Sequence, residues 1–130
     1  MAVVDLYNGE QVIDTSLDNV VIVNMFECSP SGGRSLDVTG FKPTVIKAGH
    51  VIIKETATNE YKPMPVNEAG DAYAALPSNH SIVGIAYSSA LTRKPFMTIM
   101  VRGTVNQVAS PYPVTDAIKV ALPLIRFTQD

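Results

Sequence analysis

The sequence predicts a mainly β, single-domain protein with one short helix near its C-terminal end. A length of 130 residues fits one domain of ordinary size. A hydrophobic content of 46% with 17% charged residues is enough to form a core and excludes wholesale disorder. Short runs of β-branched residues alternate with Gly, Pro, Asn and Asp turn residues, whereas the clearest helical spacing falls in residues 115–122.

The chain divides into an irregular part, residues 1–43, and a more regular part, residues 44–130. In the first part the run from Val20 to Phe26 is β-branched and predicts a strand. Residues 29–33 contain a Gly pair, but they lack the Gly-Lys-Ser pattern and the following amphipathic helix of a phosphate-binding loop. We therefore expect a plain loop there.

The regular part contains the stronger strand signals. Residues 96–105 form the clearest one, because apolar side chains recur at odd positions. Gly103 within it predicts a bulge or a close backbone approach. In residues 82–87, alternation places the odd-numbered side chains on one face and the even-numbered ones on the other. Further strands are expected at 44–47, 51–56, 59–63 and 124–127, with a turn at 48–50, a hairpin connection at 57–59 and Pro63 at a strand end or sheet edge.

The helix signals lie before the last strand. Thr115 is a suitable N-cap, and Asp116 suits the positive end of the helix dipole. Pro123 is expected to end the helix, because proline disfavours helical geometry in the residue before it. Within the loop 67–80, residues 72–76 are compatible with one short helical turn.

No residue pattern indicates catalysis, a cofactor or a metal. His50 and His80 each lie in an expected turn, and neither has a carboxylate, Cys or second His at the spacing of a local metal site. The pair Ser88-Ser89 follows a strand but lacks the Gly-x-Ser-x-Gly pattern of a nucleophile. Asp14 and Asp18 stand among turn residues, where we expect solvated carboxylates. The sequence therefore predicts that the chain is not an enzyme.

Charge and targeting signals restrict the partners. The net charge is −2 without a run of Lys or Arg, so neither nucleic acid nor an anionic membrane is expected as a partner. The apolar run Val20 to Val23 is too short to span a bilayer, and no secretory signal is visible. Cys28 is the one cysteine, which suits a reducing cytoplasm. The basic pair Arg93-Lys94 is expected in a solvated hairpin connection, where it could also contact an acidic neighbouring subunit.

An ordered series of strand and glycine patterns runs from Val45 to Phe127. The series consists of Ile46-Lys47-Ala48-Gly49-His50-Val51-Ile52, Glu60-Tyr61-Lys62-Pro63, Ile82-Val83-Gly84-Ile85-Ala86, Ile99-Met100-Val101-Arg102-Gly103-Thr104-Val105, and the helix and strand of residues 116–127. In its order and spacing this series resembles the head decoration proteins of tailed phages.

The resemblance implies a structural role. Similar proteins have a small barrel-like or β-tulip-like fold, bind the assembled major capsid protein on the outer surface of the virion, often as trimers, and have no catalytic residues or cofactors. Particles of this kind assemble in the host cytoplasm. An N-terminal arm that pairs with the capsid surface is common among them.

Two interpretations of residues 1–43 stay open: a capsid-binding arm, or added strands that complete the same barrel. We expect part of residues 1–26 to pair with a capsid or sister subunit by adding a strand to its sheet. The residues expected to contact a partner are Val20, Val21, Ile22, Val23, Met25 and Phe26, together with the hairpin residues Arg93 and Lys94.

Two other functions compete with capsid decoration. One is the capsid-anchoring base of a head fibre, although such bases usually lead into a repetitive shaft and this sequence ends at Asp130, shortly after its last expected strand. The other is a small β-barrel enzyme or ligand carrier, which would need a concave site with convergent polar groups. Convergence of His50, His80 and acidic side chains would favour it.

Overall fold

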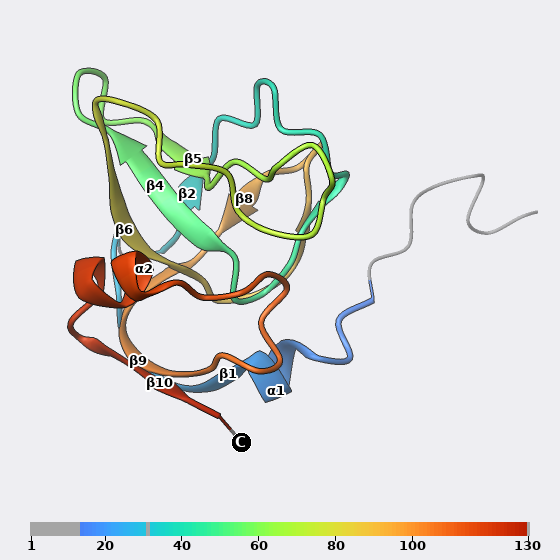
Figure 1. Ribbon diagram of the computed structural model, residues 1–130, viewed down its shortest axis with the longest axis vertical. Helices are drawn as coiled ribbons and strands as arrows, with labels where there is room; N and C mark the ends of the chain where they lie inside the picture. Colours follow the sequence, from blue (N-terminus) through green and yellow to red (C-terminus); the bar gives the residue numbers. More distant parts are fainter. Residues whose placement is uncertain (1–13, 31, 130) are drawn as a thin grey trace, which may run out of the picture.

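A computed structural model describes residues 14–30 and 32–129 of the chain, and within them the prediction of a mainly β protein is confirmed (Figure 1). The expectations for residues 1–13 lie outside this range. The elements in chain order are α1 (Asp18–Val21), β1 (Ile22–Cys28), β2 (Arg34–Ser35), β3 (Val45–Ile46), β4 (Val51–Glu55), β5 (Tyr61–Pro63), β6 (His80–Ala86), β7 (Ala90–Leu91), β8 (Phe96–Met97), β9 (Ile99–Asn106), α2 (Asp116–Ala121) and β10 (Ile125–Thr128).

Six strands form the main sheet, in the order β1-β9-β6-β4-β5, and β10 pairs in parallel with β9. Two short ribbons, β2-β8 and β3-β7, complete the strand pairing of the described residues. Figure 1 shows β1, β9 and β10 together at one end of the molecule, with β4 and β5 toward the other. The main sheet is open along this path, and β5, which ends at Pro63, lies at its edge as predicted.

The middle of the sheet is buried on both faces. On β4, Val51 and Ile53 pack into one cluster, and Ile52 between them packs into the other. Ile99 and Met100 on β9 divide in the same way, so consecutive residues are fully buried and strict polar alternation is absent there. We call the clusters the α2-side core (Val21, Ile22, Ala48, Val51, Ile53, Met64, Ile85, Met100, Val105, Ile118, Leu122, Ile125) and the β2-side core (Leu36, Ile46, Ile52, Ala86, Met97, Ile99).

The alternation predicted for residues 82–87 is wrong because β6 contains a bulge. Ile52 pairs with Gly84 but Ile53 pairs with Ile82, so Val83 has no partner in the register with β4. As a result, Ile82 and Ile85 both face the α2-side core. The predicted strand 96–105 is likewise divided: β8 pairs with β2, whereas β9 belongs to the main sheet.

The run Val20–Phe26 does not form one strand. Its first two residues complete the helical turn α1, and the strand begins at Ile22. β1 pairs antiparallel with β9, so residues 22–28 lie in the same sheet as the strands of the regular part. Val21 and Ile22 enter the α2-side core, which fixes this segment against the domain.

Near the C-terminus the local signals are confirmed. The side chain of Thr115 caps α2 by accepting a hydrogen bond from the Ile118 N–H, and the helix ends at Ala121, two residues before Pro123. By contrast, the helical turn considered for residues 72–76 is wrong. Tyr73 forms a β-bridge with Val66 instead, and residues 74–77 form no helical turn.

Candidate interaction surface

The apolar residues of α1 and β1 divide between the core and the surface. Val21 and Ile22 are buried and Met25 packs against the α2-side core. Val23 and Phe26 are instead 54% and 68% exposed, on a strand that lies at the edge of the main sheet. Exposed apolar side chains that gather on one element are typical of contact surfaces. The surface also includes the exposed side chains of Leu17, the N-cap residue of α1, and of Val20 within α1.

A carboxylate fixes α1 to the rest of the domain. Asp18 accepts hydrogen bonds from the backbone N–H of Ser89 at 3.0 Å and from its hydroxyl at 2.8 Å. The Ser89 hydroxyl oxygen in turn accepts from the Ala48 N–H at 3.1 Å. The expectation that Asp18 is a solvated turn residue is therefore wrong, whereas Asp14 is exposed and accepts from Ser16, which lowers the pKa of its carboxyl group. Of the Ser88-Ser89 pair, Ser89 is therefore the residue that anchors α1.

Strand β1, whose other edge is free, is irregular. Its pairing with β9 contains three register shifts in seven residues. At Gly103 the backbones approach so closely that a Cβ atom would contact the Asn24 carbonyl oxygen, which confirms the predicted close approach. Bulges and twists of this kind blunt an edge strand and hinder the addition of another strand. Contacts by side chains are therefore favoured here over an extension of the sheet.

One face of the three strands β1, β9 and β10 is open to solvent. Arg102 and Arg126 are exposed and Thr104 is half-buried between them, whereas Val105 and Ile125 on the opposite face are buried. This alternation is that of a sheet with one face on the core. The Arg102 guanidinium lies over the ring of Phe26, with 6.0 Å from Cζ to the ring centroid. We call this surface, formed by Asn24, Phe26, Glu27, Arg102, Thr104 and Arg126, the open sheet face.

The other predicted contact residues lie elsewhere. Arg93 and Lys94 are exposed in the turn between β7 and β8. The expected hairpin is wrong, because β7 pairs with β3 and β8 pairs with β2 rather than with each other. The basic pair therefore sits on the ribbon side of the domain and not on the main sheet.

His50 lies at the centre of a buried aromatic cluster. It is 1% exposed, and the rings of Phe41, Tyr73 and Tyr112 contact it edge-on at centroid distances of 5.4, 5.2 and 5.5 Å. His50 Nε2 lies 2.9 Å from the Met64 carbonyl oxygen, so this nitrogen carries a proton. Burial lowers the pKa of His50 to about 4. The neutral ring thus packs against aromatic side chains from three different loops. Burial also raises the pKa of the Tyr73 phenol.

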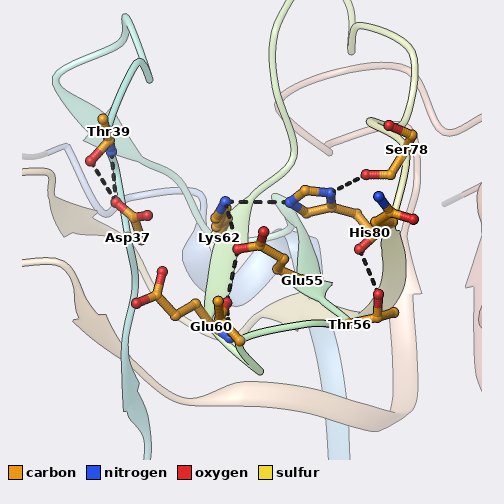
Figure 2. Close-up of polar contacts among 10 residues, drawn as sticks. Asp37, Thr39, Glu55, Thr56, Glu60, Lys62, Ser78 and His80 are labelled. Atoms are coloured by element: carbon orange, nitrogen blue, oxygen red, sulfur yellow. Dashed lines mark hydrogen bonds and ion pairs between the residues drawn. The ribbon is translucent and has the colours of Figure 1, made fainter.

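His80 belongs to a separate polar network, drawn in Figure 2. Its Nδ1 donates to the Ser78 carbonyl oxygen at 2.8 Å, so its Nε2 is the acceptor for Lys62 Nζ at 3.3 Å. Lys62 also forms an ion pair with Glu55 at 3.3 Å. Hydrogen bonds from Thr58 and then Lys62 lower the pKa of Glu55. Both side chains of the ion pair are partly exposed, so the network contributes little to stability.

The two histidines therefore lie in different environments and do not share a site. Among residues 14–30 and 32–129, no group of three or more His, Cys, Asp and Glu side chains could hold a metal ion. The surface has an apolar groove of about 590 Å³ between α2 and β6, whose lining includes Met64, Tyr73, Leu76, Ile82 and Ile118.

Comparisons with known proteins give no relative. No family model, no curated protein and no solved structure matches the chain. Within the described residues, no helix is long and apolar enough to cross a membrane.

Proposed function

We propose that this chain is a structural virion protein that binds the outer surface of a phage head and stabilises it. The observation that carries the proposal is the exposure of Val23 and Phe26 on β1, an edge strand fixed firmly to the domain. An apolar side chain that is 68% exposed gains free energy when a partner covers it. The ordered strand and glycine series from Val45 to Phe127, which resembles head decoration proteins, supports the choice of partner.

The irregular pairing of β1 changes how we expect the N-terminal part to contact its partner. The register shifts of β1 hinder strand addition, so the partner is contacted by side chains of α1 and β1. Val21, Ile22 and Met25 hold the segment in place from the core side. A barrel-like or β-tulip-like description of the fold is part of the same proposal and rests on the resemblance of residues 45–127 to head decoration proteins. Trimer formation is a further part of it.

Binding to capsids tests the proposal. Purified chain is mixed with empty mature capsids of the phage that encodes it, and bound protein is measured by cosedimentation and light scattering. We expect binding at micromolar concentration and a higher capsid melting temperature. The double variant Val23→Ser, Phe26→Ser should weaken binding at least tenfold, because truncating central apolar contacts commonly costs more than about 1.4 kcal/mol.

The matched control is Val120→Ser on α2. Val120 is 79% exposed and lies on another element, so its replacement should leave capsid binding unchanged. Failure of the wild-type chain to bind capsids at micromolar concentration would contradict the proposed function. If the β1 variant and the control lose binding equally, the capsid remains the partner, but β1 is not the surface that contacts it.

A second candidate, a small ligand carrier, is favoured by the groove between α2 and β6. Its volume of about 590 Å³ falls in the range of ligand pockets, and its lining is mainly apolar. An apolar fluorescent probe such as anilinonaphthalene sulfonate should then bind the native protein, and Ala117→Trp should block it. Absence of probe fluorescence at neutral pH would exclude this candidate.

A further inference from the structure

We propose that the open sheet face binds a protein surface with an apolar side chain at its centre and carboxylates around it. The inference rests on the proposed function and names the chemistry of the partner. It goes beyond exposure of β1, because the observations that carry it lie on β9 and β10 as well.

The register places the polar groups of the three strands together. Thr104 on β9 is opposite Asn24 on β1 and opposite Arg126 on β10. Arg102 is two residues before Thr104 on β9, so its side chain projects from the same face. Arg102 is therefore a diagonal neighbour of Arg126 across the β9–β10 pair. Two guanidinium groups thus project from a small area of the sheet.

Among the residues that the structure describes, no carboxylate forms an ion pair with these guanidinium groups. Glu27 is the cross-strand partner of Arg102 in the register, yet Arg102 lies over the Phe26 ring, and the ion pair found among the described residues joins Lys62 and Glu55. The Arg126 side chain forms no hydrogen bond or ion pair within residues 14–30 and 32–129. The face therefore has two basic groups against one acidic group, although the whole chain carries a net charge of −2.

The residue types are those of a binding hot spot. Aromatic rings and Arg are enriched at the centres of protein interfaces, and Arg pairs with carboxylates in a two-pronged geometry. The contact with the Phe26 ring favours a position of the Arg102 guanidinium over the open sheet face before binding, which reduces the entropy lost on association. Phe26 offers the apolar centre, while Arg102 and Arg126 offer the carboxylate contacts.

A nucleic-acid partner is disfavoured by the charge count. Two arginines with a neighbouring Glu27 can contact few phosphates, and affinity for nucleic acid depends on the number of phosphates neutralised. Pairing with a second copy through this face would bring Arg102 and Arg126 against a surface of the same charge. A protein surface with carboxylates around an apolar side chain can cover the Phe26 ring and also pair with both guanidinium groups.

Charge reversal on capsids gives the first test. Arg102→Glu and Arg126→Glu should each weaken capsid binding at least tenfold, and higher salt should weaken binding of the wild-type chain. Arg102→Lys should lie in between, because Lys keeps the charge but lacks the planar fork. Lys42→Glu, an equal charge change at an exposed loop residue, should have no effect. If the wild type binds capsids and the reversed variants bind equally well, the inference is overturned while the proposed function stands.

A second test does not depend on capsids. The ¹⁵N-labelled chain is titrated with an acidic copolymer of glutamate and tyrosine, with polyglutamate and with oligothymidylate. Amide shifts should change in β1, β9 and β10 with the glutamate-tyrosine copolymer and less with polyglutamate, and Arg126→Glu should abolish the changes. Stronger shifts with oligothymidylate, or shifts at other strands, would overturn the inference even if capsid binding fails.

Discussion

Asp18 and Ser89, 71 residues apart, are joined by two hydrogen bonds to one carboxylate. Through the Ser89 hydroxyl the contact extends to the Ala48 backbone, next to the turn that contains Gly49 and His50. The helical turn α1, and with it the start of β1, is held to the domain at this point. The surface that we propose for partner binding therefore rests on a polar anchor as well as on the burial of Val21 and Ile22.

Replacement of Asp18 tests the anchor. Asp18→Ala should lower the free energy of unfolding by about 2 kcal/mol, because hydrogen bonds to a charged group contribute roughly 1.5–3 kcal/mol and this group is partly exposed. Urea denaturation followed by circular dichroism measures the loss. Asp14→Ala is the control: its exposed carboxylate contacts only the nearby Ser16 among the described residues, so a change below about 0.5 kcal/mol is expected. Similar losses for both variants would contradict an anchoring role of Asp18.

Acid should destabilise the fold through His50. Its pKa is about 4 in the folded state and its ordinary value is 6.5, so the unfolded chain binds the proton first as the pH falls. Titration of His50 leaves the free energy of unfolding unchanged above about pH 6.5. As the pH falls from there toward 4, this residue lowers the free energy of unfolding by roughly 3 kcal/mol. His50→Gln, whose amide can still donate to the Met64 carbonyl, should lack this part of the loss.

The measurement is the difference between the two proteins. Denaturation curves at several pH values give the free energy of unfolding for wild type and His50→Gln, and groups that both proteins share cancel in the difference. The curves should converge as the pH falls from about 7 to 4. A constant difference over this range would show that His50 is not held neutral by burial.

The parts of the fold that sequence reasoning predicted are those with local causes. The N-cap at Thr115, the end of α2 before Pro123 and the close approach at Gly103 each depend on a few neighbouring residues. The hairpin between β4 and β5 also follows from turn chemistry, and Asn59 adopts the positive φ of 60° that such a connection needs.

The errors arise where tertiary contacts decide. The bulge at Val83 brings Ile82 and Ile85 onto the same core. Gly84 beside it is the local signal that could have indicated the bulge, by the rule that was applied to Gly103. Asp18 looks like a solvated turn residue until Ser89 is placed beside it. On the open sheet face, the alternation of Arg102 and Thr104 is visible in the sequence. The neighbouring position of Arg126 depends on the parallel pairing of β10 with β9, which periodicity does not predict.

Glycine at position 103 is required by space rather than by backbone conformation. Its Cβ would contact the Asn24 carbonyl oxygen and lie 2.8 Å from the Met100 sulfur, so Gly103→Ala should cost more than about 3 kcal/mol or shift β1 away from β9. Gly40→Ala separates the two effects, since Gly40 has open space around it but a φ of +78°. There a loss of about 1–2 kcal/mol is expected. Equal costs in thermal unfolding would contradict the close contact between β1 and β9.

The cap of α2 determines how firmly the helix covers the core. The Thr115 side chain accepts from the Ile118 N–H, and Ile118 and Leu122 are buried in the α2-side core. Thr115→Ala should lower the free energy of unfolding by about 1 kcal/mol and speed hydrogen exchange at Ile118, because that N–H loses its acceptor. Thr115→Ser keeps the oxygen and should stay within about 0.5 kcal/mol of the wild type. Thr115 is exposed, and little packing of its methyl group is therefore expected. A large loss in the Ser variant would contradict this and indicate that the methyl group, rather than the cap, stabilises the helix.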